Sequence, residues 1–470
     1  MSRVRLVGLD FGSTTSGCII ASANLAHNVV SGRQELAGIH EDYRSELVFT
    51  PYNESGLDAA RLQDLMDVWL AAGRVAPGEI FGGGALLTGL AAREQNSAVL
   101  IELVRSRLGD ALIATADDPC LEAWLAFQAS AAALSRSHPD RWVINLDIGG
   151  GTTNIALGKN GEVVRTGSLF VGARHVQLVP GTYEIVKLSD FSRELFRHLG
   201  SDRGPGDCLE AAQVEAIVDF YLELLESAVT GDKRLFEQPI ARLHQQVAFE
   251  LPPDARDPIV TLSGGVGELV YGGRDETRLA STTFFGDLGI DLARRLRSLP
   301  RWAAQVSRYQ PACAGRATVY GLLLHTTQVS GNTVFLPEPA ILPLKNLPIF
   351  GCVTANSTAA QIRDILQLVK RSPLGGCVQI VAADTGAPAV AALGEQIASL
   401  LTTIGFSSEL PLVFLVEENI GKVLGQYVSR WGSMRLKLMV LDEIEIREAR
   451  FVQIGGMQNQ VVPVSFYGMN

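Results

Sequence analysis

The chain has 470 residues, of which 47% are hydrophobic and 19% charged, and its formal net charge is −10. This composition is typical of a globular protein with enough apolar residues for large cores, and the length favours about three domains. The acidic balance argues against general binding to nucleic acids or anionic membranes. It is compatible with a nucleotide bound locally by backbone amides.

The cysteines and the lengths of the apolar runs indicate in which cellular compartment the protein is expected. The six cysteines contain no CxxC pair and no spacing typical of zinc or iron–sulfur ligands. The amino-terminal residues enter an apolar, strand-like run at once and lack the apolar core and cleavage site of a secretory signal. No apolar run reaches the roughly 18 residues of a membrane-spanning helix, so none is expected. The simplest location is a reducing cytoplasm.

The first candidate site follows a strand-like run over residues 4–9. Asp10 ends this run, and a second apolar run begins at Cys18. The turn between the runs is rich in glycine and hydroxyl groups, and comprises Gly12, Ser13, Thr14 and Thr15. Taken alone, such a turn is as typical of an ordinary loop as of a phosphate site.

The next segment supplies strands and helices for the same predicted domain. Residues 24–56 are expected to hold strands, and apolar spacing predicts helices over residues 57–72 and 91–108. The stretch from Glu79 to Gly89 also contains a glycine run. Because no aspartate precedes it, we expect a strand and a turn there, without phosphate binding.

A long alanine-rich helix is expected from Pro119 to about residue 135. Asp117 or Asp118 can cap its amino terminus, with Pro119 in the first turn. Glu122 lies in the same turn. A carboxylate is favoured there by the helix dipole, and a catalytic role is an equal alternative.

The central motif runs from Trp142 to Gly158 and reads WVINLDIGGGTTNIALG. Two apolar runs flank a turn, which predicts a β-hairpin. After Asp147, the turn contains Gly149, Gly150, Gly151, Thr152 and Thr153. Glycines let the backbone approach a ligand closely, and successive backbone N–H groups form an anion site. Because Asp147 can hold Mg²⁺ through water or orient an attacking water, the motif predicts binding of Mg-ATP; a hairpin that merely turns is the alternative.

The motifs at Asp10 and Asp147 repeat one pattern: strand, aspartate, small and hydroxyl residues, strand. The repeat predicts two similar domains that face each other across a cleft. A third glycine loop follows the strand-like run 259–262 and contains Gly264, Gly265, Gly267 and Glu268. Its glycines would allow close approach of a ribose or flat packing of a base. No Walker A pattern occurs, so the chain is not a P-loop protein.

The second half carries fewer chemical signals. Arg174 and His175 are interpreted as loop residues only. Residues 189–230 are expected to be largely helical, and residues 315–325 to form an interdomain helix.

Several prolines after Pro337 mark a change in composition. Beyond them helix-like and strand-like segments alternate, with the last strands over residues 436–441 and 444–451. The predicted domains are 1–140, 141–340 and 341–470. The last is either a separate α/β lobe or the completion of the second domain.

The order LDFGSTTS, LDIGGGTTN, LSGGVGE resembles the phosphate-1, phosphate-2 and adenosine motifs of the actin/Hsp70/sugar-kinase ATPase superfamily. The resemblance implies an α/β, actin-like ATPase fold with two ribonuclease-H-like domains around a nucleotide cleft, and ATP and Mg²⁺ as cofactors. Asp10 and Asp147 match the two aspartates that position metal and water. Glu122 lies where the connecting helix often carries an acidic or amide residue near the attacking water.

Within this superfamily, the chain is similar to the EutA family of ethanolamine ammonia-lyase reactivating factors along most of its length. The segments RATVYGLLLHTTQVSGNT, LPLKNLPI and VLDEIEIREARFVQIGG carry this narrower resemblance. It implies a weak, chaperone-like ATPase that opens inactivated ethanolamine ammonia-lyase, so that damaged cobalamin leaves and adenosylcobalamin enters. The chain departs from the family at Ser13, where threonine is common, and at Ala173, where a second glycine is usual.

Other functions share this fold. A metabolite kinase would need an aspartate base at the cleft, which the sequence does not identify, and a filament-forming actin-like protein is a further alternative. Activators of radical enzymes generally need a bridging iron–sulfur cluster, and the absence of closely spaced cysteines argues against them. The sequence leaves the oligomeric state open, and a homo-oligomer is compatible with it.

Overall fold

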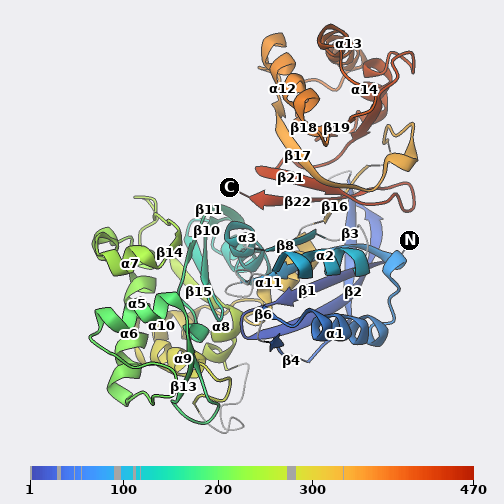
Figure 1. Ribbon diagram of the computed structural model, residues 1–470. Coiled ribbons are helices and arrows are strands. Elements are labelled where there is room, and N and C mark those ends of the chain that lie inside the picture. Colours follow the sequence, from blue (N-terminus) through green and yellow to red (C-terminus); the bar gives the residue numbers. More distant parts are fainter. Residues whose placement is uncertain are drawn as a thin grey trace.

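The amino-terminal sheet forms around the first strand–turn–strand motif. The computed structural model describes residues 3–28, 33–46, 48–53, 56–88, 97–108, 113–116, 118–272, 282–325, 327–331 and 333–469. The strands of this sheet are β1 (Arg3–Phe11), β2 (Thr15–His27), β3 (Gln34–Arg44), β4 (Val48–Phe49), β7 (Ile80–Leu87) and β8 (Ile113–Ala116), next to a small hairpin of β5 (Tyr52–Asn53) and β6 (Gly56–Leu57). Its order is β3-β2-β1-β7-β8, with β1, β2 and β3 antiparallel and β7 parallel to β1 and β8 (Figure 1).

Two helices pack on this sheet, α1 (Ala59–Ala72) and α2 (Ser97–Leu108). α1 begins after Asp58, whose side chain accepts the backbone N–H of Arg61 at 3.1 Å. The apolar face predicted for residues 57–72 is buried in the core. α2 begins at Ser97, and the start of the helix predicted there, together with Gly89, lies outside the described residues.

The second sheet repeats the first. Its strands are β9 (Trp142–Ile148), β10 (Thr153–Lys159), β11 (Glu162–Leu169), β14 (Gln245–Val247) and β15 (Ile259–Ser263), in the order β14-β11-β10-β9-β15. β9, β10 and β11 are antiparallel neighbours, and β15 is parallel to β9. These four strands correspond in order and direction to β1, β2, β3 and β7. The predicted glycine hairpin and the predicted duplication are both present.

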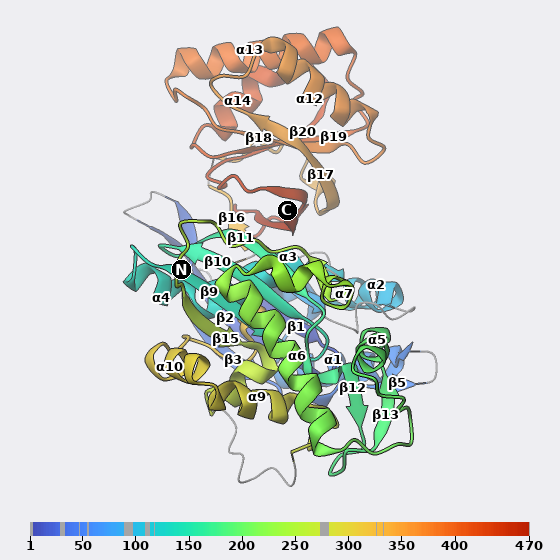
Figure 2. The same ribbon diagram turned by 90° about the vertical axis from the view of Figure 1, so that its left-hand side faces the viewer.

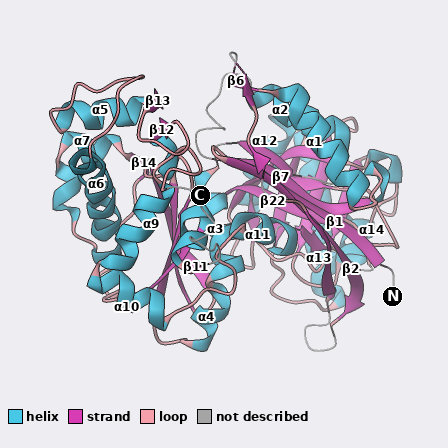
Figure 3. Ribbon diagram, turned by 90° about the horizontal axis from the view of Figure 1, so that it is seen from below, coloured by secondary structure: helices cyan, strands magenta, loops and turns pink. Residues whose placement is uncertain are grey.

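Two helices connect the halves, and each packs on the sheet of the other half (Figure 3). They are α3 (Pro119–Ser130), which continues into α4 (Ala132–Ser137), and α11 (Ala317–His325). α3 follows the first sheet in the chain, yet Phe127 packs with Val143 of the second. α11 follows the second sheet, yet Val319 packs with Leu6 of the first. The predicted interdomain helix is therefore present, and the exchange of helices ties the halves together.

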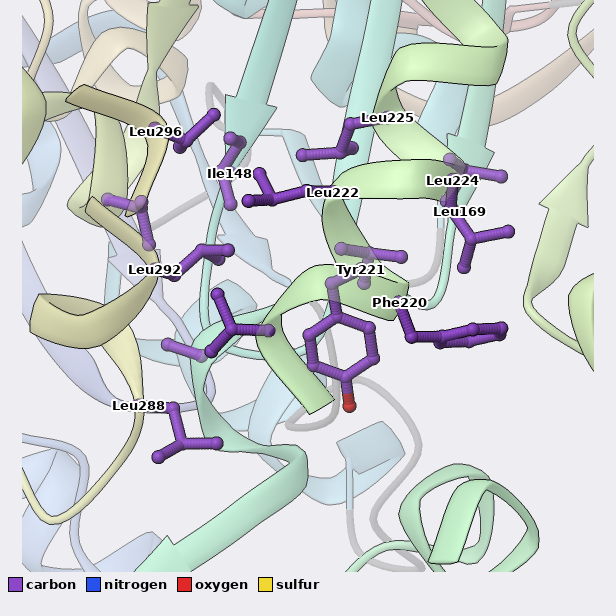
Figure 4. Packing of buried hydrophobic residues seen from close by; sticks show 14 of the residues in the cluster. Ile148, Leu169, Phe220, Tyr221, Leu222, Leu224, Leu225, Leu288, Leu292 and Leu296 are labelled. Atoms are coloured by element: carbon purple, nitrogen blue, oxygen red, sulfur yellow. The ribbon is translucent and has the colours of Figure 1, made fainter. Parts of the chain in front are cut away.

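A largely helical segment surrounds the second sheet. Its elements are η3 (Ala173–His175), β12 (Val176–Leu178), β13 (Ile185–Leu188), α5 (Asp190–His198), α6 (Ala211–Thr230), η4 (Lys233–Glu237), α7 (Pro239–Leu243), α8 (Gly264–Val270), α9 (Gly289–Ser298) and α10 (Pro300–Arg308). Residues 189–230, which were expected to be largely helical, contain the two helices α5 and α6. Figure 4 shows Leu222 and Leu225 of α6 and Leu296 of α9 around Ile148, at the end of β9.

The carboxy-terminal residues form a third sheet with cores of its own, set above the other two in Figure 2. Its strands are β16 (Thr327–Val329), β17 (Leu344–Val353), β18 (Gly376–Ile380), β19 (Pro411–Val416), β20 (Lys437–Leu441), β21 (Ala449–Ile454) and β22 (Pro463–Met469). Helices α12 (Ala359–Arg371), α13 (Ala387–Ile404) and α14 (Gly421–Val428) pack on it. The strand order is β16-β22-β21-β17-β18-β19-β20, with β17 to β20 parallel. The last predicted strand was misplaced, because β21 begins at Ala449 and residues 444–448 are irregular.

One described helix, α13, is long and apolar enough to cross a membrane by length and composition alone. Core helices of soluble proteins pass the same test. In this structure α13 buries Val390, Ile397 and Leu401 in the core of the carboxy-terminal sheet.

The carboxy-terminal sheet contacts the start of α3. Asp118 caps this helix, as predicted, because its Oδ1 accepts the backbone N–H of Leu121 at 3.0 Å. Its Oδ2 accepts the backbone N–H of Gly468 in β22 at 2.9 Å. The Arg447 guanidinium lies 5.0 Å from the centre of the Trp124 ring. The helix that carries Glu122 is therefore held from the third sheet.

Candidate active site

A cavity lies between the first two sheets, at the turns that follow β1 and β9. Both sheets and helices α3, α8, α9 and α11 contribute to its lining. The predicted site residues that line it are Asp10, Gly12, Ser13, Thr14, Thr15, Glu122, Asp147, Gly149, Gly150, Gly151, Thr152, Gly264, Gly265 and Glu268. The fold thus brings the three glycine-containing motifs, with Glu268 in the third, and the carboxylates of Asp10, Glu122 and Asp147 to one place.

Two residues predicted to bind the cofactor do not line this cavity. Thr153 is fully buried, and its hydroxyl donates to the carbonyl oxygen of Val171 at 2.8 Å. Gly267 lies in α8, where a Cβ atom would come within 2.8 Å of the carbonyl carbon of Leu262. Thr153 begins β10, where successive side chains point to opposite faces, and Gly267 allows α8 to pack closely on β15. Both residues therefore support the fold around the cavity.

The two repeated turns have the same local geometry. Gly12 N–H donates to the Thr15 carbonyl at 3.0 Å, and Gly149 N–H donates to the Thr152 carbonyl at 2.9 Å. The turns approach each other closely, because a Cβ atom on Gly150 would lie 2.5 Å from Thr14 Oγ1. Glycine-rich turns with hydroxyl groups on both sides of a cavity are suited to phosphate oxygens.

Asp10 and Asp147 lie at corresponding positions of the two turns. Thr88 Oγ1 donates to Asp10 Oδ1 at 3.1 Å, and Ser263 Oγ donates to Asp147 Oδ1 at 2.6 Å. Burial raises the pKa of Asp10 to about 7 and that of Asp147 to about 6. The negative charge of Asp147 also raises the pKa of Asp10, which indicates that the two carboxylates face a shared space.

Glu122 completes the group of carboxylates from the first turn of α3. It is 5% exposed, and Asn154 Nδ2 donates to its Oε2 at 2.7 Å. The amide is held in turn by Ser168 Oγ, which donates to Asn154 Oδ1 at 2.8 Å. Burial, followed by the charge of Asp10, raises the pKa of Glu122 well above its usual value. When ionised, a carboxylate with a raised pKa is a stronger proton acceptor than an ordinary one.

The donor set suits Mg²⁺ held mainly through water and phosphate. Mg²⁺ prefers oxygen ligands and retains several waters, so one or two carboxylates are sufficient. Within the described ranges, no group of three or more His, Cys, Asp or Glu side chains is arranged to bind a metal directly. Asp10 and Asp147 therefore fit the predicted role of metal-positioning residues for a cation that arrives with a nucleotide.

Five polar residues that line the cavity were not predicted from the sequence: Thr88, Asn154, Asp287, Arg316 and Thr318. Thr88 bonds Asp10, as described above. Thr318, at the start of α11, bonds Asp147. Thr14 Oγ1 donates to Asp287 Oδ2 at 3.4 Å and so joins the two halves across the cavity. The position of Thr88 just after the glycine run of β7 was the local signal that could have indicated its role.

Arg316 brings a positive charge to this carboxylate-rich cavity. Its φ of +56° is uncommon for a residue other than glycine. Its Nη2 donates to the Ser45 carbonyl at 2.6 Å, and its buried Nη1 has no hydrogen-bond partner among the residues that the structure describes. Such a group is available to an anionic ligand.

The duplicated sheets, the exchanged helices and the shared cleft define a protein of the actin-like ATPase fold, as predicted. The chain belongs to the family of ethanolamine utilisation protein EutA, whose model matches residues 2–468. It is 30% identical to an ethanolamine ammonia-lyase reactivase EutA from Salmonella typhimurium strain LT2 over 467 residues, covering 98% of this chain and 97% of that protein. The corresponding protein of Escherichia coli K12 is 28% identical over 483 residues, with the same coverage.

Two solved structures show a distant resemblance to the chain. An exopolyphosphatase from Cytophaga hutchinsonii is 14% identical, with a TM-score of 0.39, over 68% of this chain and 96% of that one. MreB5 of Spiroplasma citri bound to AMPPNP is 16% identical, with a TM-score of 0.26, over 63% of this chain and 96% of that one. No function is transferred from similarities of this size.

Proposed function

We propose that this protein uses ATP and Mg²⁺ to reactivate ethanolamine ammonia-lyase, by releasing damaged cobalamin so that adenosylcobalamin can rebind. One observation carries the proposal: in a chain of the EutA family, two glycine turns of the same geometry, each with its aspartate, meet at one cavity. The lyase is the proposed client, and the cytoplasm remains the expected location.

The roles of the chain's own residues follow from the geometry. The turns Gly12–Thr15 and Gly149–Thr152 would hold the phosphates through backbone amides and hydroxyls. Asp10 and Asp147 would hold Mg²⁺, which neutralises phosphate charge when bound. Glu122 would orient the attacking water and accept its proton, because its own carboxyl is held by Asn154.

Nucleotide-dependent work on a client requires that the cleft move. Asp10 and Asp147 come from different halves of the chain, and the contact between Thr14 and Asp287 crosses the cavity. A nucleotide that binds both turns would favour one relative position of the halves, and hydrolysis would release that preference. The third sheet would sense the change through Asp118, which both caps α3 and bonds β22.

The position of Asp287 supports a second candidate function, that of a metabolite kinase. A kinase needs a carboxylate base at the cleft, and Asp287 is a buried carboxylate in the cavity lining. ATP consumption that depends on a small alcohol or acid would support this function. ATP consumption without any such acceptor would favour the reactivase.

Reactivation of the lyase tests the proposal directly. Ethanolamine ammonia-lyase inactivated with cyanocobalamin is mixed with this protein, Mg-ATP and adenosylcobalamin, and ammonia release is followed. We expect recovery that requires ATP hydrolysis, so that a non-hydrolysable ATP analogue serves as the control. Hydrolysis of ATP without recovery of the lyase would contradict the proposed client.

Affinity for Mg-ATP is expected to fall roughly 10-fold between about pH 8 and about pH 6. Burial raises the pKa of Asp10 to about 7 and that of Asp147 to about 6, so both are largely ionised at the higher pH and increasingly protonated at the lower. Carboxylates must be deprotonated to hold a metal ion, so protons compete with Mg²⁺. Calorimetric titration at both pH values checks this, and an affinity that rises towards acid would contradict it. Asp10→Asn should flatten the dependence.

A further inference from the structure

The short turn η3 holds the glycine loop that follows Asp147. Ala173 N–H donates to the Gly149 carbonyl at 3.1 Å, and Arg174 N–H donates to the Gly150 carbonyl at 2.6 Å. The His175 side chain completes the series, since its Nε2 lies 2.8 Å from the Gly151 carbonyl oxygen. Three successive residues thus bind the carbonyls of three successive glycines. With its carbonyls held on one side, the loop presents a defined backbone surface to the cavity.

Close approach of the two segments requires glycine just before this turn. A Cβ atom on Gly172 would lie 2.5 Å from the Gly150 carbonyl oxygen and 2.7 Å from Gly151 N. Ala173, noted above as a departure from the resembled family, carries its methyl group beside Gly289, at the start of α9. The departure noted in the sequence therefore leaves the contact intact.

The chemistry of the partners determines the protonation of His175. A carbonyl oxygen only accepts, so Nε2 must carry the proton that binds Gly151. Burial lowers the pKa of His175 to about 3, so the ring is neutral at physiological pH and Nδ1 is an acceptor. Ser189 Oγ, 2.8 Å from Nδ1, is therefore the donor in that contact.

Ser189 is the residue that caps α5. Its Oγ accepts the backbone N–H of Ser192 at 3.1 Å, and its own N–H donates to the His175 carbonyl at 3.0 Å. The His175 ring also lies 6.1 Å from the ring of Tyr221 in α6. Figure 4 shows Tyr221 among the buried hydrophobic residues. Hydrogen bonds therefore run without interruption from the glycine loop through His175 to α5.

We propose that His175 is a positioning residue, which orients the loop 149–151 for phosphate and transmits nucleotide occupancy of that loop to α5. The inference rests on the proposed nucleotide binding and adds a residue that touches no ligand itself. A nucleotide that shifts the Gly151 carbonyl must also shift His175, because the ring is fully buried and bonded at both nitrogens. α5 then becomes the first element beyond the cleft to respond.

His244 offers a matched control. It is a fully buried histidine of the same aromatic cluster, 6.1 Å from the Tyr221 ring, but its Nδ1 bonds the Ile240 carbonyl at 2.9 Å and not the glycine loop. Replacing either histidine with phenylalanine perturbs the same core. Only His175→Phe also removes the bond to Gly151.

The experiment combines calorimetric titration with Mg-ATP and amide hydrogen exchange of α5 with and without saturating Mg-ATP. We expect His175→Phe to weaken Mg-ATP binding about 10- to 100-fold, a loss typical of residues that orient a ligand-binding group. It should also abolish the change in α5 protection that ATP causes in the wild type. His175→Gln retains an N–H donor and should recover most of the affinity, while His244→Phe should behave as the wild type.

Ser189→Ala provides a second route if His175→Phe does not fold. It should leave Mg-ATP affinity within a few-fold of the wild type but remove the ATP-dependent protection of α5. A folded His175→Phe protein with wild-type affinity for Mg-ATP and a wild-type α5 response would overturn the inference. A wild-type α5 response in Ser189→Ala would overturn it as well. A wild-type chain that binds no Mg-ATP would instead overturn the proposed function and this inference with it.

Discussion

Replacing Asp147 with asparagine is expected to reduce ATP hydrolysis at least about 100-fold, the usual effect of removing one charged or oxyanion-stabilising group from an active site. Asparagine retains the shape of the side chain and an oxygen for the hydrogen bonds from Ser263 and Thr318. It removes the negative charge that would hold Mg²⁺. The loss should therefore appear in hydrolysis and in lyase reactivation, without loss of the fold.

Thermal melting shows whether Asp147→Asn loses ATP hydrolysis because it unfolds. Because burial raises the folded pKa of Asp147 above its ordinary value, ionising this carboxyl costs stability as the pH rises through about 6. The asparagine variant without nucleotide should then be more stable than the wild type at pH 8, by roughly 2–3 kcal/mol, and the difference should disappear below about pH 4.

Asp219→Asn is the matched control for Asp147→Asn. Asp219 lies in the same half of the chain but forms an exposed ion pair with Arg295 at 2.8 Å, away from the cavity lining. Its replacement should leave ATP hydrolysis within a factor of two. Normal hydrolysis by Asp147→Asn would exclude the assigned role of Asp147.

Replacing Gly321 with alanine is expected to lower both stability and activity. Gly321 lies where α11 crosses α3, and a Cβ atom there would lie 2.3 Å from the Leu125 carbonyl oxygen. That neighbour is backbone and cannot rotate away, so the helices must separate. Overpacking of this kind costs about 1–3 kcal/mol, which exceeds the roughly 1 kcal/mol that alanine adds to an isolated helix.

Separation of α3 and α11 should also disturb the active site. α3 carries Glu122, while α11 carries Thr318, which bonds Asp147. We expect the melting temperature to fall by roughly 1–2 °C and ATP hydrolysis to fall with it, as measured by calorimetry and phosphate release. Gly204→Ala is the control, because a Cβ atom there meets no atom within 4 Å. Equal melting temperatures for both variants would contradict the close crossing of the helices.

The repeated glycine turns could be predicted because their signals are local. Each strand, aspartate and turn lies within a short stretch, and the hydrogen bonds from Gly12 to Thr15 and from Gly149 to Thr152 close within it. The same reasoning predicted a cap of α3 at Asp117 or Asp118, and the cap is Asp118, whose side chain bonds a residue three positions away. Short-range geometry of this kind can be predicted from the order of the residues alone.

The misplaced last strand shows where local patterns fail. Residues 444–448 are apolar and charged in alternation, which predicts a strand, yet pairing begins only at Ala449. Conversely, Pro348 lies within β17, where it opposes Phe451 of β21 at a position next to a break in register. A strand exists only where a partner offers hydrogen bonds, and the partner is distant in the chain.

By itself, the sequence predicted the three glycine-containing motifs and the carboxylates Asp10, Glu122 and Asp147, which line one cavity. It also identified the actin-like fold and membership of the EutA family. Only the tertiary structure decided that Asp287, Arg316 and Thr318 join the cavity, that Thr153 turns away from it, and that His175 holds the Gly151 carbonyl. The physical reason is that these side chains act through partners far away in the chain. Such partners meet only after two duplicated sheets have exchanged helices and closed a cleft between them.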